Sequence, residues 1–143
     1  MAMAQESRRA MIVPSLRYRD APAAIEFLCE AFGFARHLVV PGPEGTIRHA
    51  QLTLGDGMIM LGSAQNRDFG PHVRTPEDLG GNTQSAYVIV AGIDAHYRRA
   101  VAAGAEIVME IEDMDYGGRL YTALDSEGHL WSFGSYDPWA ASG

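Results

Sequence analysis

The sequence predicts an α+β fold built from two copies of one unit, each containing a strand, a helix and three further strands. The first observation is an internal repeat at an offset of 71 residues, which needs no gap. It aligns Gly33 with Gly104, Arg48 with Arg119, and Gly57 with Gly128. The second observation is that each copy holds a helical apolar pattern together with strand-like segments. A long period that occurs only twice indicates two supersecondary units, because a solenoid needs three or more short repeats.

The first copy carries the expected signals in order. Asp20 is a suitable N-cap for a helix that runs to Phe32, and Gly33 is a suitable C-terminal glycine. Its strands are predicted at residues 11–18, 34–40, 46–54 and 58–63. The last two strands form a hairpin across the turn at residues 55–57, where two glycines flank an aspartate.

The second copy repeats this order. Its helix is predicted at residues 93–103 and is closed by Gly104. Its strands are predicted at residues 84–90, 105–111, 119–124 and 128–135. The predicted organisation is a flexible N-terminal tail (1–9) and a single domain (10–143). Within that domain, module 1 spans about 10–63, a Gly- and Pro-containing linker 64–82, and module 2 about 83–138.

Composition excludes several classes of protein. The net charge of −7 argues against nucleic acid or an anionic membrane as a partner, because both require a basic surface. No apolar run approaches the roughly 20 residues of a transmembrane helix, and the polar N-terminus lacks the apolar core of a secretory signal. We therefore expect a cytoplasmic protein. The single cysteine, Cys29, cannot form an internal disulfide, and we expect it to be a small core residue of the first helix.

Residues 116–138, with the sequence YGGRLYTALDSEGHLWSFGSYDP, resemble the C-terminal signature of the glyoxalase/bleomycin resistance protein/dioxygenase proteins, the vicinal oxygen chelate superfamily. Residues 20–33 resemble the first helix of this group, and residues 49–61 resemble its first hairpin. The resemblance implies paired βαβββ modules whose eight strands form a cup-shaped mixed sheet. It does not select one chemistry, because the superfamily spans isomerases, dioxygenases, fosfomycin-modifying transferases and metal-free drug-binding proteins.

The resemblance also implies where a metal would be held. In the metal enzymes of the superfamily, His, Gln or Glu side chains on the first and last strands of each module bind the ion. The matching positions here are Val13, Leu61, Gln84 or Ser85, and Ser132. Valine and leucine cannot bind a metal ion and serine is a poor neutral ligand, so Gln84 is the one candidate donor. We therefore expect neither a metal site nor a cofactor.

Strand alternation selects the candidate ligand-binding residues. They are Arg17, His49, Gln51, Tyr87, Arg119 and Tyr121. An arginine inside an apolar cup is costly unless it is paired, so Arg17 or Arg119 there indicates an anionic or carbonyl-bearing ligand. The alternative for both arginines is a salt bridge at the surface or between the modules. Trp131 and Phe133 are expected in the core, and His96 is expected on the solvated surface.

These assignments predict a metal-free homodimer that sequesters or recognises a small organic molecule. The alternative is an enzyme of the same superfamily: a metal-dependent lyase, isomerase or dioxygenase, or a metal-free catalyst with His49 as the base. A third possibility is a structural or regulatory dimer without a ligand. Two or more converging His or Glu side chains would support the enzyme, and a cup filled by Met and Leu would support the third possibility.

Overall fold

The computed structural model describes residues 9–67 and 69–140, so that most of the predicted tail lies outside the described residues. The chain divides into two compact units. Among the described residues, unit 1 comprises 9–29, 33–67 and 69–75, and unit 2 comprises 30–32 and 76–140. The boundary between residues 75 and 76 lies inside the predicted linker. The last turn of the first helix, residues 30–32, is grouped with unit 2.

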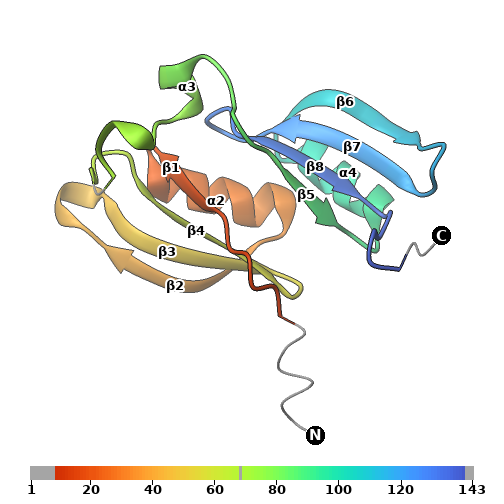
Figure 1. Cartoon of the computed structure of the whole chain (residues 1–143), viewed down its shortest axis with the longest axis horizontal. Coiled ribbons are helices and arrows are strands. Elements are labelled where there is room, and N and C mark those ends of the chain that lie inside the picture. Colours follow the sequence, from red (N-terminus) through yellow and green to blue (C-terminus); the bar gives the residue numbers. More distant parts are fainter. Residues whose placement is uncertain (1–8, 68, 141–143) are drawn as a thin grey trace, which may run out of the picture. The chain divides into compact units, whose positions relative to one another are not determined.

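Unit 1 contains one four-stranded mixed sheet in the order β1-β4-β3-β2 (Figure 1). Its elements are β1 (Ser15–Tyr18), α2 (Ala21–Phe32), β2 (Ala35–Pro41), the short 3-10 helix η1 (Pro43–Gly45), β3 (Ile47–Leu54), β4 (Gly57–Ser63) and the 3-10 helix η2 (Gly70–His72). β1 runs parallel to β4, and the other neighbours are antiparallel. The first strand is shorter than predicted, because Met11 and Ile12 are almost fully exposed and the strand begins at Ser15.

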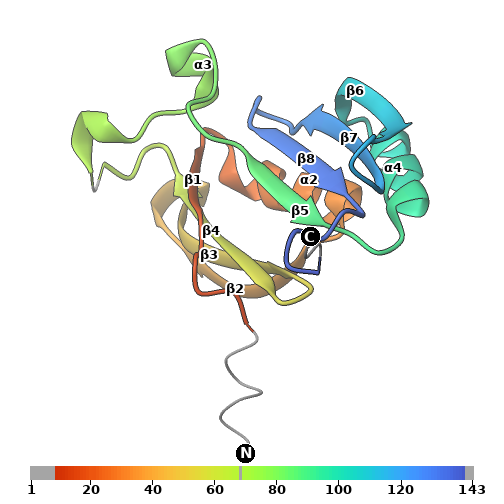
Figure 2. The same cartoon turned by 45° about the vertical axis from the view of Figure 1, so that its right-hand side comes forward.

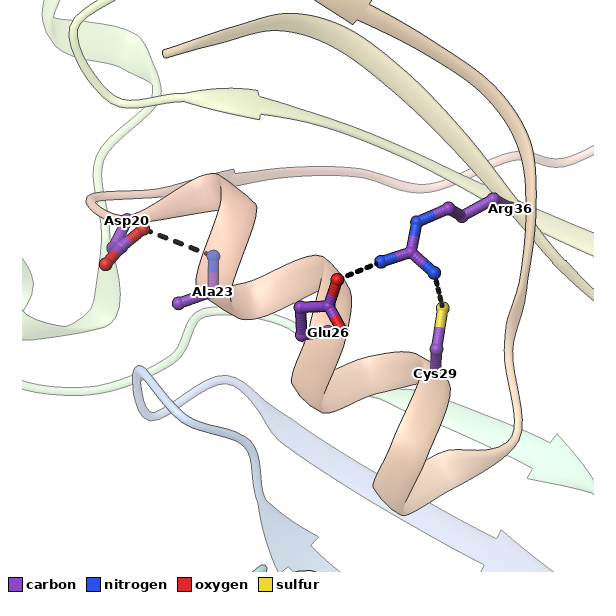
Figure 3. Close-up of polar contacts among 5 residues, drawn as sticks. All are labelled: Asp20, Ala23, Glu26, Cys29 and Arg36. Atoms are coloured by element: carbon purple, nitrogen blue, oxygen red, sulfur yellow. Dashed lines mark hydrogen bonds and ion pairs between the residues drawn. The ribbon is translucent and has the colours of Figure 1, made fainter. Parts of the chain in front are cut away.

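Helix α2 begins and ends where its capping residues predict. The Asp20 carboxylate accepts a hydrogen bond from the Ala23 backbone N–H at 3.2 Å, and Gly33 adopts the left-handed conformation with φ of 85°. Figure 3 shows that Arg36 reaches from β2 to this helix, where it donates to the Glu26 carboxylate and to Cys29 Sγ. Cys29 is half-buried, so it is less enclosed than the core residue that the sequence predicts.

Unit 2 repeats this architecture, with sheet order β5-β8-β7-β6 (Figure 2). Its elements are the short helix α3 (Pro76–Leu79), β5 (Ala86–Ile89), α4 (Ile93–Ala102), β6 (Glu106–Asp113), β7 (Arg119–Leu124) and β8 (Leu130–Gly134). β5 runs parallel to β8, as β1 does to β4. The predicted fold class, α+β with two βαβββ modules, is therefore confirmed. No helix in the described part of the chain is long and apolar enough to cross a membrane.

The two hairpins differ by one residue in their turns. In unit 1, two residues separate the paired Leu54 and Gly57. In unit 2, residues 126–128 form the turn, and the Asp125 N–H donates to the His129 carbonyl at 2.9 Å. The gapless alignment of the repeat therefore fails on the last strand of each unit, and it shifts every position there by one residue.

Strand register identifies the correct equivalents. Ser132 lies opposite Tyr87 on β5, and in unit 1 the residue opposite β1 at the matching place is Met60, which faces Ser15. The sequence assigns this position to Leu61, and that assignment is wrong. Leu61 is 2% exposed and belongs to the opposite, buried face of the sheet.

Aromatic side chains form the core of unit 2. We call Phe32, His96, Tyr121, Trp131 and Phe133 the aromatic core. Phe32, at the end of α2, lies 4.7 Å from Phe133 and 5.9 Å from Trp131 between ring centroids. The rings of Tyr121 and Phe133 lie 5.3 Å apart. Phe32, Tyr121, Trp131 and Phe133 are each at most 1% exposed, so the predicted core role of Trp131 and Phe133 is confirmed.

Candidate functional site

Each sheet has one buried face and one partly exposed face, which we call the open face. In unit 1 the open face carries Ser15, Arg17, His49, Gln51, Met58 and Met60. In unit 2 it carries Tyr87, Ile89, Thr122, Leu130, Ser132 and Gly134. Directly paired residues present their side chains on the same face of a sheet. The rows Ser15–Met60–Gln51 and Tyr87–Ser132–Thr122 are therefore equivalent rows of the two units.

These rows test whether the chain can hold the metal ion that the resemblance implies for the metal enzymes of that superfamily. Met60 replaces the carboxylate or imidazole that a hard divalent ion requires, and Ser132 Oγ is hydrogen-bonded to Thr122 Oγ1 at 2.8 Å. Among the described residues, no group of three or more His, Cys, Asp or Glu side chains is placed to bind a metal. The residues on these rows do not fit a hard-metal site.

Arg17 lies on the open face of unit 1, at its edge. The guanidinium Nη1 is 3.0 Å from where a Cβ at Gly62 would be, so the glycine provides room for the arginine. The guanidinium also lies 5.7 Å from the centre of the Phe69 ring, a geometry that favours a cation–π contact. Arg17 is only 8% exposed.

His49 and Gln51 form the polar centre of the same face. The Gln51 amide nitrogen lies 3.1 Å from His49 Nε2. An amide N–H donates, so with this orientation Nε2 accepts and the proton of the neutral ring lies on Nδ1. Both side chains are half-buried. The sequence prediction that they share a face agrees with the register of β3 and β4.

Tyr87 lies on the open face of unit 2 and is 37% exposed. Its hydroxyl donates to the Tyr136 carbonyl at 2.6 Å. The ring lies against the backbone of Gly134, because a Cβ at that position would be 2.5 Å from Tyr87 Oη and 2.9 Å from Cε1. Burial raises the pKa of the Tyr87 phenol, and electrostatic interaction with Tyr116, Asp137 and Tyr136 raises it further.

Tyr121 is not on the open face with Tyr87, which differs from the sequence prediction. Tyr121 is paired with Phe133 and Tyr87 is paired with Ser132. Ser132 and Phe133 are adjacent residues of β8. Successive residues of a strand point to opposite faces. Tyr121 is fully buried, and burial raises its pKa strongly. It belongs to the aromatic core rather than to a ligand-binding wall.

Arg119 occupies the same side of β7 as Tyr121. Its Nε lies 3.5 Å from a carboxylate oxygen of Asp94 and 3.5 Å from one of Asp113. All three side chains are at least 40% exposed. This arrangement matches the surface salt bridge that the sequence left open as an alternative, and it does not support an anchor inside a cup.

His96 is the residue that sequence reasoning misplaced most clearly. Its Nε2 lies 2.7 Å from the Phe32 carbonyl, and its Nδ1 lies 2.7 Å from Tyr121 Oη. A carbonyl only accepts, so Nε2 carries the proton and Nδ1 accepts from the phenol. The helical spacing held the signal, because His96 follows the buried Ile93 by three residues and precedes the buried Ala100 by four.

We expect His96 to make the protein less stable in mild acid. Burial lowers the pKa of His96 below its ordinary value of 6.5, so the unfolded chain binds the proton more readily than the folded one. The free energy of unfolding should therefore be steady above about pH 6.5, the ordinary pKa of the histidine. Below that pH it should fall, by at most about 1.4 kcal/mol per pH unit. Urea unfolding across this range measures the effect. The variant His96→Gln, which keeps a donor and an acceptor without titrating, should show a flatter profile; equal profiles would refute the assignment.

Known protein families, sequences and structures resemble this chain over most of its length. The model of the Glyoxalase/Bleomycin resistance protein/Dioxygenase superfamily matches residues 10–133. An uncharacterised protein of Mycobacterium bovis is 36% identical over 121 residues, which are 85% of this chain and 80% of that protein. One of Mycobacterium tuberculosis H37Rv is 36% identical over 85% of this chain and 71% of its own length. The crystal structure of TioX from Micromonospora sp. ML1 is 35% identical, with a TM-score of 0.73 over 87% of this chain and 97% of that one.

Proposed function

Because the chain belongs to the glyoxalase/bleomycin resistance protein/dioxygenase superfamily, we propose that it binds a small organic molecule on the open faces of its sheets without using a metal ion. The observation that carries this proposal is the chemistry of the paired rows. Met60 and Ser132 occupy the last-strand positions, and each lies among side chains that can contact an organic molecule. Because Ser15 and Tyr87 hold equivalent places in the two sheets, Val13 corresponds to Ser85 and not to Gln84. Valine and serine offer no strong metal donor.

The open face of unit 1 supports binding through mixed contacts. Met58 and Met60 present flexible thioethers, which adapt to irregular apolar shapes. The His49–Gln51 pair adds a polar centre, with the His49 Nδ1–H and the Gln51 carbonyl oxygen as groups that a ligand can engage. Ligand sites generally combine apolar walls with a few placed polar groups, and this face has both.

The same pair argues against His49 as a catalytic base. A general base needs a lone pair directed at the substrate proton. The Nε2 lone pair of His49 already accepts from the Gln51 amide, and Nδ1 then carries a proton. Neither ring nitrogen offers a lone pair in this arrangement. Binding is therefore the better supported role for the His49–Gln51 pair.

A thermal-shift screen tests the proposal. A panel of aromatic, anionic and cationic small molecules should contain compounds that raise the melting temperature in a saturable manner, because a ligand that binds only the folded state stabilises it. For a compound bound to unit 1, His49→Ala should weaken binding at least about fivefold through the lost hydrogen bond. His37→Ala is the matched control, because His37 is an exposed histidine of the neighbouring strand β2. A panel with no stabilising compound, or equal effects of the two variants, would contradict the proposal.

A further inference from the structure

We propose that the edge of unit 2 beside Tyr87 is a binding site for a small organic cation, such as a quaternary ammonium group. The inference rests on the proposed function, and it names a chemical class of ligand for one of the two open faces. The site consists of the aromatic rings of Tyr87, Tyr116 and Tyr136 with the carboxylate of Asp137. We call it the tyrosine corner site.

The rings of Tyr116 and Tyr136 form a corner rather than a slot. Their centroids lie 5.0 Å apart and their planes are inclined by 77°. The two rings are in edge-to-face contact, so their remaining π faces lie at an angle to each other. Two parallel rings would be needed to sandwich a flat molecule. The negative face of an aromatic ring attracts cations, so this corner suits a compact cation better than a planar neutral ligand.

The rings are held in place before any ligand binds. The turn at residues 114–118 is closed by the bond from the Met114 N–H to the Gly118 carbonyl at 2.9 Å. Gly118 lies so close to the segment that follows β8 that a Cβ there would be 2.8 Å from the Tyr136 nitrogen. The Tyr87 hydroxyl fixes the same segment through the Tyr136 carbonyl. A preformed site loses little conformational entropy on binding.

The rings are also accessible. Tyr116 is 54% exposed and Tyr87 is 37% exposed, so each presents aromatic surface to solvent. Exposed aromatic surface gathered in one place is uncommon on a soluble domain and generally marks a binding site. This accessibility separates the tyrosine corner site from the aromatic core, where Tyr121 is fully buried.

Local charge favours a cation over an anion. Residues 114–118 and 135–139, which build the site, contain two aspartates and no basic residue. Asp137 is close enough to act electrostatically on the Tyr87 phenol. The nearest basic residue in sequence, Arg119, is paired with Asp94 and Asp113. A cation at the corner would therefore meet negative charge and π faces together.

Choline and its neutral isostere 3,3-dimethylbutan-1-ol test the assignment, because the two differ mainly in charge. Titration of the full chain, followed by ¹H–¹⁵N NMR, should show saturable shifts at residues 115–118 and 135–137 with choline. The isostere should bind at least about tenfold more weakly, and added salt should weaken choline binding. Equal binding of both compounds, or no binding of choline at millimolar concentrations, would overturn the proposal.

Variants separate the ring from the charge. Tyr116→Leu, which keeps bulk but removes the π face, should weaken choline binding at least about fivefold, and Tyr116→Phe should lose less. Asp137→Asn should also weaken it, while Glu110→Gln removes the same charge elsewhere in unit 2 and should not. If Leu and Phe at position 116 act alike, the π contact is refuted.

If choline does not bind while a screened compound still depends on His49, the cation site is refuted and small-molecule binding stands. If choline binds as expected while the screen yields no compound that depends on His49, the cation site stands and the assignment to unit 1 fails.

Discussion

Replacing Phe32 with alanine is expected to lower the free energy of unfolding by about 3–5 kcal/mol, the range for removing a fully buried aromatic ring. Phe32 is 0% exposed and lies against Phe133, Trp131 and His96. Its removal leaves a cavity at the centre of the aromatic core, and the stacked rings around it cannot collapse without losing their own contacts. Urea unfolding, followed by near-ultraviolet circular dichroism, measures the loss.

Trp139→Ala is the control for Phe32→Ala. Trp139 is larger than Phe32 but is 90% exposed, so its removal should change the stability by less than about 0.5 kcal/mol. A loss below about 1 kcal/mol for Phe32→Ala would contradict the packing described for unit 2. A variant too unstable to purify can be replaced by Phe32→Leu, for which a smaller loss in the same direction is expected.

Asp125→Ala is expected to destabilise the protein by about 3–5 kcal/mol, because it removes three hydrogen bonds to a charged group, each of roughly 1.5–3 kcal/mol and not additive within one network. Asp125 is only 6% exposed. Its carboxylate accepts from the backbone N–H groups of Glu127 and His129 and from Trp131 Nε1, at 2.9–3.1 Å. Alanine would leave the indole N–H of Trp131 buried without this partner.

The other copy of the repeat supplies a matched control for Asp125→Ala. Asp56 lies in the hairpin turn of unit 1 and is exposed. Asp56→Ala should therefore cost less than about 1 kcal/mol. Similar losses for the two variants would show that the Asp125 carboxylate does not organise the longer turn of unit 2. Thermal or urea unfolding of the two variants side by side makes the comparison.

The elements could be predicted from the sequence because local chemistry determines them. Asp20 and Gly33 bound α2 through contacts within a few residues of the chain. The hairpin of unit 1 follows from its glycine-flanked turn, and the core role of Trp131 and Phe133 follows from alternation with Ser132. The repeat itself could be read as two βαβββ modules, because each module carries its own complete set of signals.

The open faces could be predicted only in part, because they depend on strand register. One extra residue in the turn of unit 2 moves the equivalent of Ser132 from Leu61 to Met60. Alternation along β7 places Tyr121 on the face opposite to Thr122, but it does not say which of the two faces is buried. The pairing of Tyr121 with Phe133 on β8 decides that. His96 has a helical position typical of a buried residue. A histidine is nevertheless predicted to be exposed to solvent unless its hydrogen-bond partners are known.

The contacts of the two arginines could not be predicted, because they depend on which elements become neighbours. Arg119 meets Asp94 of α4 and Asp113 of β6, a combination that no spacing rule provides. Arg17 is enclosed between Gly62 and Phe69, and the space for its guanidinium exists because residue 62 lacks a side chain. Both outcomes depend on which strands become neighbours.

The central claim is that the open faces bind a small molecule without a metal ion, and metal titration tests it most directly. The protein should be purified without chelator or histidine tag, analysed for metal content and titrated with Zn²⁺, Ni²⁺, Mn²⁺ and Fe²⁺. We expect substoichiometric metal and no saturable binding, since Met60 and Ser132 occupy the last-strand positions of the two sheets. Stoichiometric binding at micromolar affinity or better would contradict it and would favour a metal-dependent enzyme of the same superfamily.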